Sequence, residues 1–162
     1  MNTFDELRQK YPALIPANAK FECGEGWVGV LDRYFDEVAS LLPEGSMFRL
    51  DDVRQRYGAL TIDTFDPPDA SDEIRNALAK AAALADSRSI RSCETCGKPG
   101  QMREGSWGFV ACDEHAGGTK PVPPEVAVFG GVGDTRYIYD EETDSMVVLT
   151  PSRAKAIPWL TD

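Results

Sequence analysis

The sequence predicts an α+β fold with two main helices, β-hairpins, a small cysteine-containing finger and a further β-hairpin near the C-terminus. Three observations lead to this expectation. Two long segments place apolar residues at helical spacing. Shorter segments alternate apolar and polar residues between turns that contain glycine or proline. Two pairs of cysteine or histidine residues, each with two residues between its members, follow the second helical segment.

The N-terminal part of the chain is expected to form a short helix and a long one. The short helix covers residues 3–11, because Thr3 can cap its N-terminus and Glu6 stands at the capping-box position. The long helix runs from Trp27 to about Leu42, with its apolar residues on one broad face. We therefore expect the long helix to pack on the core and to turn its acidic face to solvent.

A β-hairpin and a second long helix are expected next. The hairpin covers residues 47–65, with its turn at 56–58. Either Ser71 or Asp69 can cap the helix that follows, from about residue 72 to 88. Its alanines favour helix and let neighbouring elements approach closely. This helix leads directly into the cysteine motif and is expected to orient it.

The most specific motif runs from Cys93 to His115. Cys93 and Cys96 form a CxxC pair, and Cys112 and His115 form a CxxH pair after an interval of 15 residues. Three thiolates and one imidazole are a normal ligand set for a structural zinc ion. Because the chain has a single histidine, this motif uses all of its imidazole chemistry. A closed set of four ligands predicts a zinc ion that holds the fold rather than one that performs catalysis.

The residues between the two pairs predict the form of the finger. Gly97 can provide the tight backbone that a CxxCG knuckle needs. Short strands are expected at 101–103 and 107–111, and residues 112–116 resemble the first turn of a helix. A knuckle, a hairpin and ligands on a helix start are the parts of a treble-clef-like finger, here within residues 93–115.

Cys23 is the fourth thiol and lies outside the paired motif. We expect it to be a small buried apolar residue, with a redox role or an alternative zinc ligand as the competing interpretations.

Zinc-spaced thiols favour a reducing compartment. The N-terminal residues lack the basic and apolar regions of a signal peptide, and no apolar run approaches the length of a membrane span. These features predict a cytoplasmic protein.

The C-terminal part is expected to form a separate small lobe. Residues 1–116 would make the α+β body, 117–125 a linker and 126–162 a lobe that contains a second hairpin. Its strands are expected at 135–140 and 145–150. The glycines between 130 and 133 lack the GK[ST] of a phosphate loop and are interpreted as a turn.

The turn of this second hairpin is strongly acidic. It holds Asp140, Glu141, Glu142 and Asp144. The spacing does not match a calcium-binding EF-hand loop. The turn is therefore either a solvated acidic tip or a contact point for a basic protein partner.

The whole chain has a net charge of −10, which constrains its partners. An acidic surface repels phosphate backbones and thus disfavours nucleic-acid binding over the whole molecule. The same charge accelerates encounter with a basic protein, although it also serves plain solubility.

The ordered combination of motifs resembles a group of small, uncharacterised bacterial and phage proteins with a CGxGW segment at a helix start and a CxxCG…CxxH zinc knuckle. The resemblance covers roughly residues 21–116. It rests on the segments Cys23-Gly24-Glu25-Gly26-Trp27, Arg56-Tyr57-Gly58-Ala59-Leu60, Cys93-Glu94-Thr95-Cys96-Gly97-Lys98-Pro99-Gly100, Trp107 and Cys112-Asp113-Glu114-His115. It implies the α+β body and a metal held by the four ligands above, and it implies no activity.

An enzyme is the least supported of three functional hypotheses. With the histidine committed to the metal, no Cys/His or Ser/His pair can form. An active site made of carboxylates alone could use Asp32, Asp36 or Asp63, but nothing in the sequence singles them out.

The other two hypotheses are binding functions. A nucleic-acid-binding finger would use the cations around the motif, namely Arg88, Arg91, Lys98 and Arg103. Against it stand the acidic charge and the lack of interleaved aromatic and basic residues. The favoured hypothesis is an acidic, non-enzymatic inhibitor of the immunity or anti-defence type, which masks a basic protein partner. Part of its support is the bacterial and phage setting of the resemblance, which is an association rather than a physical argument.

Overall fold

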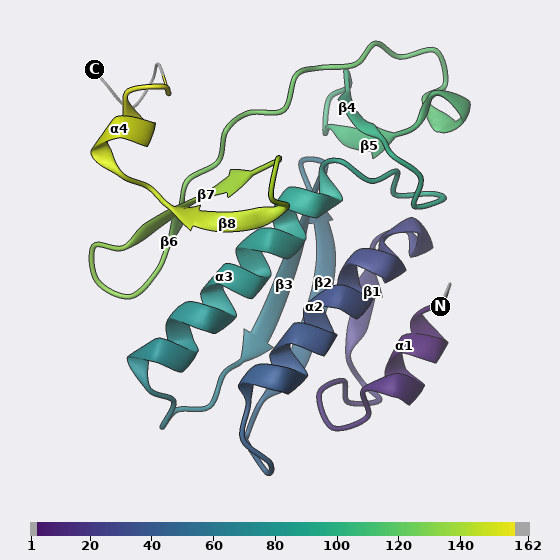
Figure 1. Ribbon diagram of the computed structural model, residues 1–162. Coiled ribbons are helices and arrows are strands. Elements are labelled where there is room, and N and C mark those ends of the chain that lie inside the picture. The colour runs from purple at the N-terminus through teal and green to yellow at the C-terminus, as the bar shows by residue number, and fades with distance from the viewer. Residues whose placement is uncertain (1–2, 158–162) are drawn as a thin grey trace.

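The computed structural model describes residues 3–157, and it confirms the α+β fold class (Figure 1). Three small sheets are combined with helices of very different lengths. In chain order the elements are α1 (Phe4–Lys10), β1 (Lys20–Glu22), η1 (Glu25–Trp27), α2 (Val28–Leu41), β2 (Arg49–Arg56), β3 (Ala59–Phe65), α3 (Asp72–Ser89), β4 (Gln101–Arg103), β5 (Phe109–Ala111), η2 (Asp113–His115), β6 (Phe129–Gly130), β7 (Arg136–Asp140), β8 (Ser145–Val148) and α4 (Pro151–Ala154).

The capping predictions for the helices are confirmed. The Thr3 hydroxyl accepts a hydrogen bond from the Glu6 N–H, and the Thr3 N–H donates to the Glu6 carboxylate, which completes the capping box of α1. For α3 the cap is Ser71, whose hydroxyl accepts from the Ile74 N–H. Asp69, the alternative, lies outside the helix.

The main sheet has the order β1-β2-β3, and α2 and α3 lie across one of its faces (Figure 1). The β2–β3 hairpin is antiparallel, as expected, and pairs Val53 with Ile62. β1 runs parallel to β2, and sequence reasoning missed it. Three residues are too few to show a period of two, so only the tertiary pairing makes this segment a strand.

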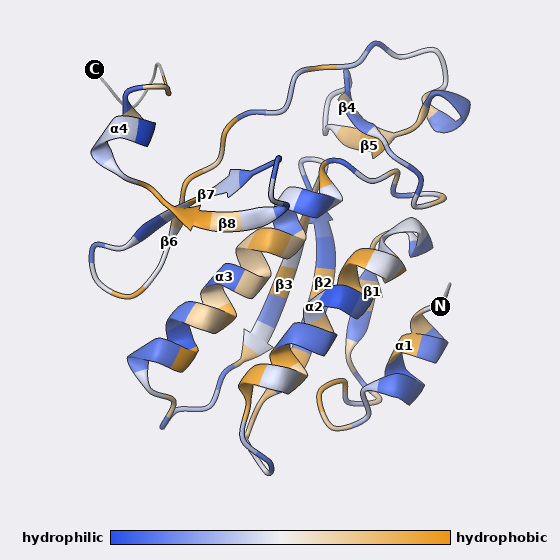
Figure 2. Cartoon of the chain, in the orientation of Figure 1, coloured by the Kyte–Doolittle hydropathy of each residue, from blue (hydrophilic) through white to orange (hydrophobic). Residues whose placement is uncertain are grey.

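The core lies between this sheet and the helices. Trp27, Leu31, Phe35, Leu50 and Val53 are fully buried in one cluster. Each such side chain stabilises the fold by roughly 1.5–3 kcal/mol relative to an exposed position. In Figure 2, α2 and α3 carry both orange and blue stretches, as helices with both buried and exposed positions do.

Helix α3 is buried on two sides rather than one. Leu78 and Ala81 pack into the main core. Ala83 packs with Tyr137 and Met146 of the C-terminal sheet. The second contact was not predicted because an alanine-rich helix has no strongly contrasting faces.

The C-terminal sheet has the order β6-β7-β8, and β7 and β8 form the expected hairpin, with Tyr137 opposite Val148. It packs on α3 through the cluster just described. The Val132 N–H donates a hydrogen bond to the Asn76 side chain, 2.7 Å away, which ties the glycine-containing turn to the same helix. The proposed division into body, linker and lobe stays a prediction, and residues 158–162 of the lobe lie outside the described residues.

The Asp144 side chain connects the C-terminal sheet to α2 and α3 through several hydrogen bonds. Its carboxylate accepts hydrogen bonds from Nε and Nη2 of Arg88. It also accepts from the Arg33 guanidinium and from the Tyr139 hydroxyl, each at 2.8 Å. Asp144 also has a φ of 47°, which L-residues rarely adopt. The β7–β8 turn is therefore held in one conformation against α2 and α3.

Among residues 3–157, no helix combines the length and the apolar character needed to cross a bilayer.

Replacing Asp144 with Asn is expected to loosen the C-terminal sheet. Hydrogen bonds from Arg88 outweigh burial and hold the pKa of the Asp144 carboxyl well below its usual range. Its stabilising effect is therefore complete above the unfolded-state pKa of about 4 and is lost as the pH falls through the lower folded-state pKa. Hydrogen exchange at pH 7 should show faster exchange of the β7–β8 amides in Asp144→Asn, and the difference in melting temperature from wild type should shrink below pH 4.

Glu142→Gln is the matched control, because Glu142 is exposed in the same turn and makes no ion pair among the described residues. Equal exchange rates in Asp144→Asn and in wild type would contradict the anchoring role of Asp144.

Candidate metal centre

The four predicted ligands come from two segments that follow α3 and β5. Cys93 and Cys96 lie in a tight knuckle, in which the Gly97 N–H donates to the Cys93 carbonyl and the Cys93 N–H donates to the Lys98 carbonyl, both at 2.8 Å. Gly97 has a φ of 76°, which confirms the expected need for glycine at this position.

Cys112 is the N-cap of the short 3₁₀ turn η2, and His115 is the last residue of that turn. The sequence predicted the first turn of a helix at residues 112–116, whereas the segment forms only a 3₁₀ turn. Gly117 and Gly118 both adopt positive φ and end the turn immediately after Ala116.

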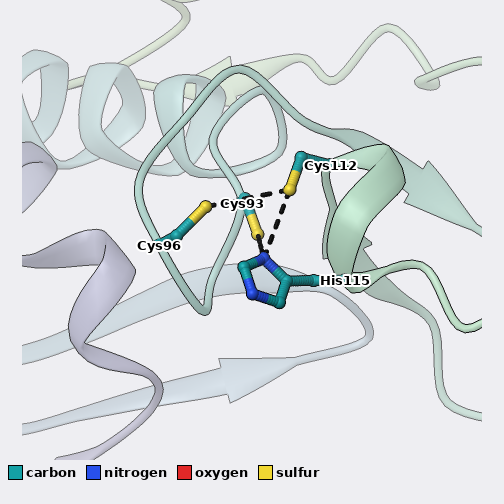
Figure 3. A group of neighbouring side chains, drawn as sticks. All are labelled: Cys93, Cys96, Cys112 and His115. Carbon is teal, nitrogen blue, oxygen red and sulfur yellow. Dashed lines mark hydrogen bonds between the residues drawn. The ribbon is translucent and has the colours of Figure 1, made fainter.

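The ligand atoms converge on one point (Figure 3). All four lie within 4.8 Å of one another. His115 Nδ1 is 3.6 Å from Cys93 Sγ and 3.2 Å from Cys112 Sγ, and Cys96 Sγ is 3.8 Å from Cys112 Sγ. A tetrahedral zinc ion with bonds of about 2.3 Å to sulfur and 2.0 Å to nitrogen separates its ligand atoms by about 3.5–3.8 Å. The residues therefore form a Cys3His group that could hold a metal ion, and its donor set and spacing suit zinc.

The surroundings of the thiols favour their binding to a cation. Burial disfavours the ionised form of Cys93, but backbone hydrogen bonds from Cys112, Cys96 and Thr95 outweigh it and lower the pKa of this thiol to about 6. For Cys96, a backbone hydrogen bond from Lys98 favours the thiolate, but burial and the Cys93 and Cys112 sulfurs together raise its pKa. Three thiolates so close together repel one another, and a divalent ion removes that repulsion.

The knuckle is packed directly on the start of α2. The Gly26 N–H donates to the Glu94 carbonyl at 2.8 Å, and the Gly24 N–H donates to the Glu94 carboxylate at 2.9 Å. A Cβ at Gly24 or Gly26 would collide with the backbone of Cys93 or Glu94. The buried Trp27 donates its indole N–H to the Ser92 carbonyl at 2.9 Å. The CGEGW segment is therefore a docking surface for the metal knuckle.

The hairpin of the finger has a second docking point on the β2–β3 turn. Gln55 donates its side-chain amide to the Gly108 carbonyl at 3.1 Å. A Cβ at Gly58 would lie 2.5 Å from the Met102 sulfur, so the turn fits closely against β4. The knuckle and the hairpin of the finger are thus both held by the body. Gly24 and Gly26 lie at the first contact, and Gly58 lies at the second.

The fourth cysteine takes no part in the cluster. Cys23 lies outside the group formed by the other three and His115. Burial, with a contribution from the nearby Glu94 carboxylate, raises the pKa of the Cys23 thiol to about 12. A thiol that stays protonated is a poor nucleophile and a poor ligand, which favours the interpretation as a partly buried apolar residue.

The three carboxylates considered for an active site are not brought together. Asp32 forms an ion pair with Lys10 at 2.8 Å and accepts from the Tyr11 hydroxyl. Asp63 pairs with Arg54 at 3.0 Å on the sheet, and Asp36 is exposed on α2.

The four cations considered for nucleic-acid contact each face a carboxylate. Two of them are held by the acidic turn of the C-terminal hairpin, and two by the η2 turn. The pairs are Arg88 with Asp144, Arg91 with Glu141, Lys98 with Glu114 and Arg103 with Asp113.

Only some of the carboxylates in the acidic turn are therefore available to a partner. Glu141 and Asp144 are held in the pairs just given, while the Asp140 carboxylate accepts from the Glu142 N–H. The Glu142 side chain is exposed. The pairing of Arg88 with a residue 56 positions away could not be found from the sequence, because no local spacing connects two such segments.

Comparisons with known proteins identified no relative of this chain. No protein-family model, no curated protein and no solved structure matches this chain. The metal centre therefore rests on the geometry of the Cys3His group, and the resemblance to bacterial and phage proteins stays a prediction.

Zinc content provides the first check of this centre. Native mass spectrometry should show one zinc ion per chain, and Cys96→Ser should lose it. Because the metal closes the finger, we expect the free energy of unfolding to fall by more than about 3 kcal/mol in that variant. Cys23→Ser is the matched control and should keep one zinc ion. A wild-type protein without zinc after expression in zinc-containing medium would contradict the assignment.

The docking of the knuckle can be checked with two glycines of the same region. Gly26→Ala places a methyl group against backbone atoms of the knuckle and should destabilise the protein by about 3 kcal/mol or more. Gly29→Ala, one helical turn further on, meets nothing within 4 Å and should stabilise α2 by up to about 1 kcal/mol. Urea denaturation measures both, and equal effects of the two substitutions would disprove the close approach.

Proposed function

We propose that the protein is a non-enzymatic, zinc-stabilised acidic protein that binds and neutralises a basic protein partner, as an inhibitor of the immunity or anti-defence type. The observation that carries the proposal is the closed Cys3His group. It commits the only histidine of the chain to a site with no position left for water or substrate.

The proposed zinc ion has a structural role in this function. Cys93, Cys96, Cys112 and His115 hold it, and it supplies a fixed crosslink between the knuckle and the η2 turn. The finger has only short strands and a small apolar cluster of its own. A segment of this size needs a metal to stay folded.

The charge distribution supports a protein partner over a nucleic acid. The cations of the nucleic-acid hypothesis are neutralised within the chain, so they are not arranged to replace phosphate counterions. The net charge of −10 attracts a basic protein over distances of about a Debye length. In this proposal Asp140 and Glu142, which lack an internal cation among the described residues, contribute to the acidic surface that the partner meets.

The test is to capture the partner on immobilised protein in a lysate of the native host, with and without nuclease treatment. We expect a basic protein that stays bound after nuclease treatment and is released by 0.5 M salt, because salt screens the attraction. Addition of the purified protein at equal molar amount should abolish the partner's activity.

Charge reversal gives the matched comparison. Asp140→Lys with Glu142→Lys should slow association about tenfold at low salt, while Glu44→Lys, at an exposed site in the α2–β2 connection, should change it less. If nuclease treatment releases everything that is bound, the nucleic-acid hypothesis replaces this proposal.

A further inference from the structure

Two large aromatic side chains lie together on the surface where the finger meets the main sheet. Tyr57 and Trp107 are each 74% exposed, and their rings stack with centroids 6.4 Å apart and planes inclined by 29°. Tyr57 lies in the β2–β3 turn and Trp107 in the β4–β5 turn. Together they expose on the order of 300 Å² of aromatic surface. Every other phenylalanine, tyrosine or tryptophan side chain among residues 3–157 is buried or partly buried, so a stacked pair in solvent is an exception that calls for a role.

The backbone that presents the two rings is tightly constrained. Tyr57 has a φ of 50°, a left-handed conformation that residues with a side chain rarely adopt. A Cβ at Gly108 would lie 3.0 Å from the Tyr57 carbonyl oxygen, and Gln55 donates to the Gly108 carbonyl. The two turns are therefore locked together, and the rings are presented in a preorganised arrangement that reduces the entropy lost on binding.

Five other aromatic rings of this protein make cation–π contacts with an arginine or lysine of the same chain. An arginine or lysine lies over the ring face in each of these pairs: Arg8 with Phe21, Lys10 with Tyr11, Arg49 with Phe65, Lys80 with Tyr137 and Arg91 with Tyr139. Within residues 3–157, the faces of Tyr57 and Trp107 have no such cation. The two most exposed rings are thus free to take one from a partner.

The charged residues next to Tyr57 and Trp107 in the chain have no net charge that would repel a partner's cation. Arg56 and Glu104 are the nearest charged neighbours along the chain and carry opposite charges. The attraction for a cation comes from the ring faces nearby and from the acidic molecule as a whole.

We propose that Tyr57 and Trp107 form the anchor surface for an arginine-bearing segment of the basic protein partner. This inference rests on the proposed function and names the site that it uses. Arginine fits better than lysine because its planar, weakly hydrated guanidinium group stacks on aromatic faces. The acidic surface accelerates the encounter, and the aromatic pair slows dissociation.

The test uses an arginine–glycine repeat peptide as the probe and fluorine NMR of the zinc-loaded protein labelled with 5-fluorotryptophan. The Trp107 resonance, assigned by its loss in Trp107→Phe, should shift saturably with peptide, whereas the buried Trp27 should not shift. Trp107→Ala should weaken binding of the peptide about tenfold, and a glutamate–glycine peptide should not bind.

Met47→Ala is the matched control, because Met47 is an apolar side chain with similar exposure, 66%, in the α2–β2 connection. It should leave the affinity unchanged. Tyr57→Asn, which suits a positive φ, removes the second ring without straining the turn and should weaken binding in the same way as Trp107→Ala.

Two results would overturn the inference. If the peptide binds equally well to wild type, Trp107→Ala and Tyr57→Asn, the contact lies elsewhere, and the proposed basic partner still stands on the capture experiment. If oligothymidine shifts the Trp107 resonance and the arginine peptide does not, the rings stack on nucleic-acid bases instead.

Discussion

The close approach of two backbone segments, at Gly24–Gly26 and at Cys93–Glu94, determines how the rest of this molecule is arranged. Their hydrogen bonds join the start of α2 to the metal knuckle, and any side chain on the two glycines would separate them. The knuckle in turn determines where the β4–β5 hairpin lies. That hairpin meets the β2–β3 turn through Gly108 and Met102. The finger is therefore attached to the body at two points, and both its metal ligands and its exposed surface are oriented by these contacts.

Polar contacts organise the other side of the molecule. Helix α3 ends next to the knuckle, and its Arg88 reaches the Asp144 carboxylate of the C-terminal hairpin. Arg91, one turn later, pairs with Glu141 and lies over the Tyr139 ring. Because Arg88 is largely buried and its partner has a lowered pKa, this pair is better placed than an ordinary surface ion pair to fix the hairpin. The acidic turn thus stabilises the fold as well as contributing charge.

These contacts shape the functional proposal. Arg88 and Arg91 near the finger are paired with carboxylates of the acidic turn, and Lys98 and Arg103 are paired with carboxylates of the η2 turn. What they leave at the surface is an excess of negative charge and one aromatic pair, at Tyr57 and Trp107. A binding protein with steering charge and a small rigid anchor has the two parts that fast and persistent association requires. In this proposal, a metal held by the Cys3His group would rigidify the finger that carries Trp107, and its four protein ligands would leave no open coordination position.

The sequence by itself determined α1, α2, α3, the hairpins and the Cys3His group, because each depends on residues that are close in the chain. Ser71 caps α3 through the N–H of a residue three positions away, and the CxxC and CxxH pairs are local as well. Only the tertiary structure decided that β1 joins β2, that α3 is buried on two sides, and that Arg88 meets Asp144. Each of these joins segments whose sequences carry no shared period or spacing. Their proximity follows from how the core packs and from which charges it brings together, and those are properties of the whole chain.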